Sequence, residues 1–166
     1  MVTAVSAEVV ARAWELLAQV PDPELPTVSV VDLGIARDVW VEGGTVVVAL
    51  TPTYSGCPAM TEIVHDVRVR LESAFGSVDV RTVLQPPWTS DAITEEGRRK
   101  LAASGIAPPS GRASLSLTVL GQDRPAACPQ CGSDDVKELA AFGSTACKAL
   151  WRCGSCQEPF DYVKRH

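Results

Sequence analysis

Two cysteine pairs near the end of the chain constrain its fold more than any other feature. The pairs are CPQC at 128–131 and CGSC at 153–156. Residues 132–152 separate them, and this spacing closely fits that of structural zinc sites. Each pair offers two thiolates from one tight turn, and the two pairs complete a closed tetrahedral site of four sulfurs. The sequence therefore predicts a zinc ribbon, with the ligands Cys128, Cys131, Cys153 and Cys156.

Three alternatives to a zinc site are open from the sequence alone. Disulfides would require an oxidising compartment. A rubredoxin-like iron would accept the same four sulfurs. A fifth cysteine, Cys147, lies between the pairs, so four of the five could instead hold an iron–sulfur cluster. Zinc is favoured because the two pairs already complete a mononuclear site, and a strand expected to begin near Lys148 would put Cys147 at its edge.

Composition and charge narrow the class of protein. The chain has 166 residues, of which 46% are hydrophobic and 21% charged, enough for one core-bearing domain and a small appendage. No apolar run approaches the roughly 20 residues that span a bilayer, and the first residues lack the features of a signal peptide. We therefore expect a cytoplasmic protein that does not bind membranes. Nucleic-acid binding is not expected either, because no basic stripe is present.

The domain boundary is expected where glycine, proline and serine accumulate. The segment SGIAPPSGRAS at 104–114 has this composition, and five of the six cysteines follow it. The sequence predicts an α/β domain over residues 1–110 and a zinc-ribbon domain over residues 124–166, with a linker at about 105–123. The second domain is too small for a large core, so its metal would supply much of its folding free energy.

Hydrophobic periodicity predicts a mixed α and β fold for the first domain, a small sheet backed by helices. The expected elements are a helix from an N-cap at Ser6 to about Gln19, two strands within 35–51 joined across Gly43-Gly44, a helix over 58–75, a strand within 77–85 and a helix within 86–105. Trp88 follows two prolines, and it either covers the end of the core or forms a stiff recognition surface.

A single cysteine, Cys57, lies outside the ribbon, in the stretch TPTYSGCPAM at 51–60. Proline is favoured at the first position of a helix, so Pro58 would put Cys57 at the N-cap. There the helix dipole and unpaired N–H groups would lower the pKa of the thiol. The sequence predicts a nucleophile or a soft metal ligand; the alternative is a small buried apolar residue.

Three motifs in this part of the chain are similar to those of the MIP18-like (DUF59) family. They are DPELP at 22–26, VVDLG at 30–34 and TPTYSGCPA at 51–59, and the resemblance covers about residues 6–105. The family includes iron–sulfur assembly factors of the SufT kind and the eukaryotic cytosolic iron–sulfur targeting factor. The resemblance implies a small sheet backed by helices, often in a homodimer. It also implies a pocket formed by Asp22, Glu24, Thr53 and Cys57.

The whole chain, including LQPPWTSDAITEEGRRKL at 84–101 and the ribbon, resembles the PaaD family, the D proteins of bacterial phenylacetate-degradation clusters. This resemblance implies partners in a phenylacetyl-CoA epoxidase: a diiron oxygenase and an iron–sulfur flavoprotein reductase, together with the iron–sulfur assembly machinery. The chain itself lacks paired Glu-x-x-His motifs, a dinucleotide fingerprint and the plant-type cluster spacing.

The sequence therefore favours an accessory factor, not an enzyme, that helps to insert iron or an iron–sulfur cluster into the reductase or the oxygenase. In this hypothesis Cys57 is a transient ligand for iron or a cluster, Asp22 and Glu24 orient it, and the zinc ribbon docks the client. One alternative is a stoichiometric structural component of the oxygenase. Another is an enzyme in which Cys57 attacks a thioester. For this alternative the sequence offers no obvious base to activate the thiol, because neither His65 nor His166 is well placed.

Overall fold

The computed structural model describes residues 2–54, 56–110 and 123–165, and its contacts divide the chain into two compact units. The first unit runs from Met1 to Trp88 and the second from Thr89 to His166. The division therefore falls earlier than the linker expected at about 105–123. Residues 89–110 belong to the second unit, together with the ribbon.

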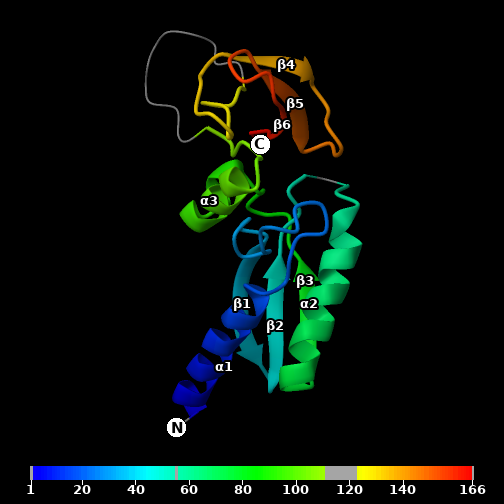
Figure 1. The fold of residues 1–166 in the computed structure, drawn as a ribbon. Helices are drawn as coiled ribbons and strands as arrows, with labels where there is room; N and C mark the ends of the chain where they lie inside the picture. Colours follow the sequence, from blue (N-terminus) through cyan, green and yellow to red (C-terminus); the bar gives the residue numbers. More distant parts are fainter. Residues whose placement is uncertain (1, 55, 111–122, 166) are drawn as a thin grey trace. The chain divides into compact units, whose positions relative to one another are not determined.

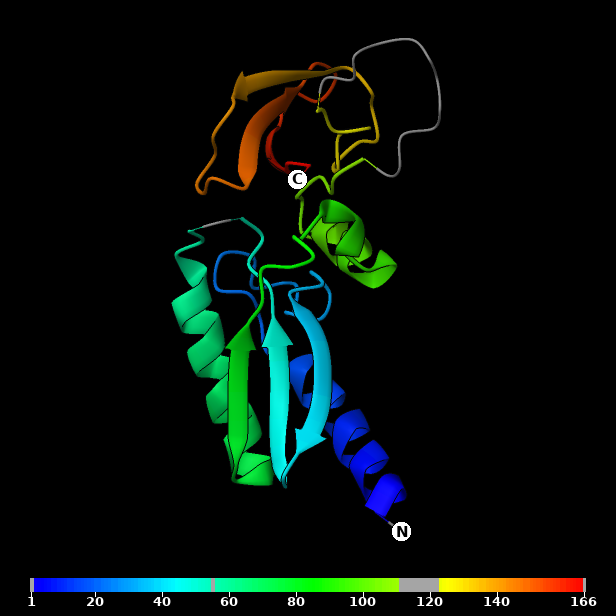
Figure 2. The same cartoon turned by 180° about the vertical axis from the view of Figure 1, so that it is seen from behind.

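The first unit is a three-stranded sheet with two helices. Its elements are α1 (Val2–Leu17), β1 (Ala36–Glu42), β2 (Thr45–Leu50), α2 (Ala59–Phe75) and β3 (Val78–Thr82). The strand order is β1-β2-β3, with β1 antiparallel and β3 parallel to β2. Both views show α1 and α2 on the same face of the sheet (Figures 1 and 2). This arrangement confirms the expected mixed sheet backed by helices.

The local signals for the hairpin and the first helix had different outcomes. The hairpin turns across Gly43 and Gly44, whose φ angles of 57° and 85° are accessible to glycine at little cost. The helix α1, by contrast, begins at Val2, so the prediction of an N-cap at Ser6 was wrong. Residues 2–5 contain no glycine or proline to stop the helix, and a serine can be accommodated within it.

Trp88 closes the core of the first unit. Its side chain is buried, and its indole N–H donates to the Leu33 carbonyl at 2.8 Å. A buried indole needs such an acceptor, so the contact holds the end of the unit against the loop after Val30. The alternative of an exposed recognition surface at Trp88 is therefore excluded.

The second unit is an antiparallel three-stranded sheet preceded by a short helix. Its elements are η1 (Ser90–Ala92), α3 (Glu95–Ala103), β4 (Val136–Ala140), β5 (Lys148–Cys153) and β6 (Pro159–Val163), with strand order β4-β5-β6. The hydroxyl of Thr94 accepts the Gly97 N–H at 3.0 Å and so caps α3. The hydrophobic core of the second unit includes three buried aromatic side chains, those of Trp151, Phe160 and Tyr162.

Backbone hydrogen bonds attach the segment after α3 to the ribbon. The Ala107 N–H donates to the Asp161 carbonyl at 2.8 Å, and the Val163 N–H donates to the Ala107 carbonyl at 3.0 Å. Ala107 thereby forms a parallel bridge with Tyr162. These bonds explain why residues around 105–110 belong to the second unit although their composition is that of a linker. Across the described residues, no helix is both long and apolar enough to cross a membrane.

Candidate functional site

The four ribbon cysteines converge on one point. Their sulfur atoms all lie within 4.8 Å of one another, with 3.8 Å between Cys128 and Cys156 and 3.5 Å between Cys131 and Cys153. Tetrahedral coordination with Zn–S bonds of about 2.3 Å requires sulfur atoms about 3.8 Å apart. The thiol groups therefore fit a four-coordinate metal ion.

Backbone groups around the cysteines also favour bound thiolates. The Gln130 N–H donates to the Cys128 sulfur, and the Cys156 N–H donates to the Cys153 sulfur, each at 3.4 Å. The N–H of Cys156 is the largest influence that lowers the pKa of Cys153. Such donors stabilise sulfur that carries negative charge, as a metal ligand does.

Gly154, in the turn of the second cysteine pair, lies against Asp135. The Gly154 N–H donates to the Asp135 carbonyl at 2.7 Å, which joins this turn to the residues that follow the first cysteine pair. A Cβ atom at position 154 would lie 1.9 Å from a carboxylate oxygen of Asp135. A larger residue at this position would therefore require the Asp135 side chain to move.

Cys147 is outside the metal-binding set. Its side chain is buried, and its sulfur lies 3.1 Å from the Thr145 hydroxyl. β5 begins at Lys148, so Cys147 lies at the edge of that strand as the sequence predicts. The group of clustered ligand atoms contains the other four ribbon cysteines and not Cys147.

The first loop of the thiol site is organised by Asp22. One of its carboxylate oxygens accepts the N–H groups of Glu24 and Leu25 at 2.9 and 2.8 Å, and its own N–H donates to the Val28 carbonyl at 3.0 Å. Asp22 is buried and Glu24 is half-buried. Asp22 therefore builds the turn that presents Glu24.

The second loop presents Cys57 just before α2. The helix begins at Ala59 with Pro58 as its N-cap. Cys57 therefore precedes the N-cap by one residue, whereas the sequence predicted it to be the N-cap itself. Its N–H donates to the Tyr54 carbonyl at 3.2 Å, and its carbonyl accepts the Met60 N–H at 3.3 Å. The second bond spans three residues, as in a 3₁₀ turn, so the regular helix starts only after the proline. The thiol is half-buried.

The pKa of the Cys57 thiol is raised, which contradicts the lowered value predicted from the sequence. Partial burial is the largest cause. The Ala59 N–H and the Thr53 side chain act in the opposite direction, and the negative charges of Glu24 and Asp22 raise the pKa further. The other three residues expected in the pocket, Asp22, Glu24 and Thr53, thus all act on the Cys57 thiol, and the four residues come from two separate loops. At neutral pH the resting group is therefore a thiol rather than a thiolate.

Removing one of these charges should change the reactivity of Cys57. Because a thiolate is disfavoured beside a carboxylate, Glu24→Gln should lower the pKa of Cys57 toward its ordinary value and speed alkylation at neutral pH. The pH dependence of iodoacetamide labelling, followed by peptide mass spectrometry, measures this pKa. Glu72→Gln on the exposed side of α2 is the control and should change nothing. An unchanged pKa in Glu24→Gln would contradict the proximity of the two groups.

Two features of this region were missed from the sequence. Ser29 and Asp32 bind each other's backbone: the Ser29 N–H donates to the Asp32 carboxylate at 2.9 Å, and the Asp32 N–H donates to the Ser29 hydroxyl at 3.1 Å. The Ser-x-x-Asp spacing could have indicated this reciprocal pair. Thr51 is buried, and its hydroxyl has no hydrogen-bond partner among the described residues. No sequence signal marks that hydroxyl.

The fold and the sites define a protein with two parts: a small α/β unit that presents a half-buried thiol, and a ribbon with four clustered cysteines that could hold a metal ion. Residues 11–84 match the family described as iron–sulfur cluster assembly protein, and residues 113–164 match the family described as PaaD zinc beta ribbon domain.

Individual relatives agree with this division. The chain is 44% identical over 152 residues to an Escherichia coli protein assigned as a component of 1,2-phenylacetyl-CoA epoxidase, covering 91% of this chain and 90% of the relative. It is 39% identical over 89 residues to an Fe-S protein maturation auxiliary factor of Porphyromonas gingivalis, covering 52% of this chain and 84% of that protein. The crystal structure of a DUF59 domain from Bacillus anthracis superposes with a TM-score of 0.56 at 28% identity, covering 60% of this chain and 96% of that domain.

The chain therefore belongs to the PaaD family, whose E. coli relative is assigned to phenylacetyl-CoA epoxidase. The names of these relatives describe a component of a complex and an auxiliary maturation factor, not a catalyst. The resemblance stated from the sequence motifs is confirmed, both for the assembly-factor domain and for the ribbon.

Proposed function

We propose that this protein is a maturation factor for a phenylacetyl-CoA epoxidase system, and that it assists the insertion of iron or an iron–sulfur cluster into the reductase or the oxygenase. The observation that carries the proposal is the half-buried Cys57 thiol beside Glu24, Asp22 and Thr53. The relatives add support, because one is assigned to the epoxidase and another is named for the maturation of Fe-S proteins.

In this function iron or the cluster is cargo, and Cys57 is a transient ligand. The thiol is protonated at rest, so it gives up its proton when its sulfur binds the metal, and the proton passes to water. The carboxylates of Glu24 and Asp22 disfavour a bare thiolate but favour a cation beside it. The two carboxylates thus favour the thiolate of Cys57 when it is bound to a metal cation and disfavour it when the site is empty.

The incomplete ligand set supports transient rather than permanent binding. Within residues 2–54, 56–110 and 123–165, the ribbon cysteines form the group of ligand side chains that could hold a metal ion, and Cys57, Asp22 and Glu24 do not form such a group. A cargo metal held there would need further ligands from the donor or the client. A site that needs its partner's ligands can release its cargo to that partner.

We further propose that the ribbon metal is zinc. Four sulfurs at tetrahedral spacing suit zinc or iron, and the match of residues 113–164 to a zinc beta ribbon supports zinc, whose closed four-sulfur sites are structural. The zinc ion would be held by Cys128, Cys131, Cys153 and Cys156. It would thereby fix the turn before β4 against the turn after β5.

The assignment of the E. coli relative to the epoxidase itself favours a second candidate, a structural component that stays in the mature oxygenase. The third, an enzyme acting on thioesters, has less support. His65 is exposed on α2, and His166 lies outside the described residues, so a histidine base beside Cys57 is not identified.

The proposal is tested by the metal content of the client proteins. The reductase and the oxygenase should be purified from cells with and without this protein, and their iron and acid-labile sulfide measured. We expect a deficit in one of them when the protein is absent, and recovery when the wild-type gene is restored. Equal iron and sulfide in both preparations would contradict maturation.

A further inference from the structure

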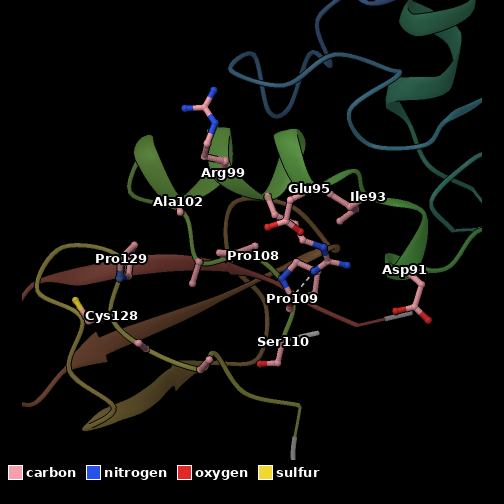
Figure 3. Close-up of a pocket in the computed structure, with 14 residues that line it drawn as sticks. Asp91, Ile93, Glu95, Arg99, Ala102, Pro108, Pro109, Ser110, Cys128 and Pro129 are labelled. Atoms are coloured by element: carbon pink, nitrogen blue, oxygen red, sulfur yellow. Dashed lines mark hydrogen bonds between the residues drawn. The ribbon is translucent and has the colours of Figure 1, made fainter. Parts of the chain in front are cut away.

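The second unit contains a surface hollow of about 820 Å³, which is distinct from the Cys57 pocket and from the cluster of four ribbon sulfurs. One side is formed by α3, a second by the segment 107–110, and a third by residues 126–129 at the first cysteine pair (Figure 3). Its volume lies in the range of binding pockets in proteins.

Part of the lining is apolar. Ile93, Ala107 and Pro109 are buried, whereas Ala102, Pro108 and Pro129 are half-buried. These short or rigid side chains leave space between α3 and the cysteine turn, and an apolar side chain would fill it with little cost in side-chain entropy to the protein.

Hydrogen bonds hold the walls in place. Arg98 donates to the Ser90 carbonyl at 2.8 Å and to the Pro109 carbonyl at 2.6 Å, so it connects η1, before α3, to the segment after α3. Gly105 lets α3 approach the cysteine turn, because a Cβ there would lie 3.0 Å from the Gln130 side chain and its φ of 81° favours glycine. The hollow is therefore preorganised.

The charges around the hollow are unequally available. Arg98 is occupied by two carbonyl groups, and Arg99 pairs with Glu96 at 2.6 Å. Figure 3 shows the Arg99 side chain pointing away from the segment 108–110. Asp91 and Glu95 also line the hollow, and neither side chain makes a hydrogen bond or ion pair with another described residue. The charge available to a ligand is therefore negative.

We propose that this hollow docks a segment of a partner protein in which lysine or arginine side chains alternate with small apolar ones. The apolar lining residues would contact the uncharged side chains, and Asp91 and Glu95 would pair with the cations. The inference deepens the proposed function, since the client is the expected partner, but it concerns only the second unit and requires neither Cys57 nor iron.

The test uses the purified full-length protein and a short synthetic peptide of alternating lysine and valine, with a glutamate–valine peptide as the counterpart. Binding is measured by titration calorimetry, and the contact residues by amide chemical shifts. We expect the lysine peptide to bind, with shifts at Ile93, Ala102 and Ala127, and the glutamate peptide to bind more weakly. Absence of binding by the lysine peptide, or equal binding of both peptides, would overturn the inference.

Two matched sets of variants locate the contact. Ala102→Trp fills the hollow and should weaken binding about tenfold or more, whereas Ala103→Trp, on the exposed side of the same helix, should not. Asp91→Asn and Glu95→Gln should each weaken binding about two- to fivefold, and Glu72→Gln in the first unit should not. Equal losses for all the variants within either set would refute the location.

Two further outcomes bear on the occupant and on the proposed function. If the protein forms a dimer that Ala102→Trp dissociates, the occupant is a second copy of the chain and the inference fails. Cys57→Ser should bind the lysine peptide as the wild type does. A normal peptide affinity together with unchanged client iron would therefore reject maturation while leaving the docking hollow in place.

Discussion

Cys153→Ser should abolish metal binding and unfold the ribbon, the largest structural effect expected of any single replacement in this protein. Cys153 is fully buried, and its sulfur lies 3.5 Å from that of Cys131. Structural zinc supplies on the order of 10 kcal/mol of folding free energy in small domains, so the ribbon core around Trp151 and Tyr162 should not persist without it. Metal analysis and amide hydrogen exchange measure the two effects.

Cys147→Ser is the matched control for this replacement. Cys147 is also buried in the ribbon, but its sulfur lies beside the Thr145 hydroxyl and outside the metal-binding set. We expect it to keep one metal ion per chain, at a cost of about 1–2 kcal/mol in stability. Residues 2–54 should stay protected from exchange in both variants, because the first unit has its own core. Loss of metal in Cys147→Ser, or its retention in Cys153→Ser, would contradict the assignment of ligands.

Cys57→Ser should have the largest functional effect. The side chain is half-buried and close to serine in volume, so stability should change by about 1 kcal/mol or less. Serine stays protonated at neutral pH and is a hard, poor ligand for iron in a sulfur-rich site. The variant should therefore be folded and contain its ribbon metal, while the client proteins made in its presence lose iron and the epoxidase activity falls at least about tenfold.

Normal iron in those clients would remove Cys57 from the mechanism. A folded variant without its ribbon metal would show instead that the replacement acts through the second unit. Cys147→Ser is again the control, since it removes a thiol of the same chain that lies outside both sites.

The sequence was most informative where a short motif determines the local geometry. The spacing of the two cysteine pairs predicts the convergence of their sulfurs, because each pair spans a single turn and the intervening residues form two strands. The Gly43-Gly44 hairpin follows in the same way from backbone sterics. Such features depend on few residues that are close in sequence.

The state of Cys57 could not be predicted from its neighbours in the chain. The Ala59 N–H lowers the pKa of Cys57, as expected of a backbone group at the start of a helix, but burial and the charges of Glu24 and Asp22 outweigh this effect. Both opposing influences arise from a loop that is distant in sequence, or from packing around the thiol. The pKa of a thiol is the net result of local and distant influences, and only the local ones are visible in a motif.

The boundary between the units shows the same limit. The residues Pro108, Pro109 and Ser110 have the composition of a linker, yet Ala107 pairs with β6 and Arg98 binds the Pro109 carbonyl. These contacts join residues from separate segments of the chain. The hollow beside α3 was missed for this reason, because its three walls come from separate segments.

Maturation requires that this protein loads its partners and is not itself needed in the finished epoxidase. The most direct measurement adds separately matured, iron-replete reductase and oxygenase to a lysate that contains only the Cys57→Ser variant, and follows phenylacetyl-CoA turnover. Maturation predicts full activity without any wild-type copy of the protein. A requirement for stoichiometric wild-type protein, after both partners are already iron-replete, would contradict maturation and make the protein a structural component of the oxygenase.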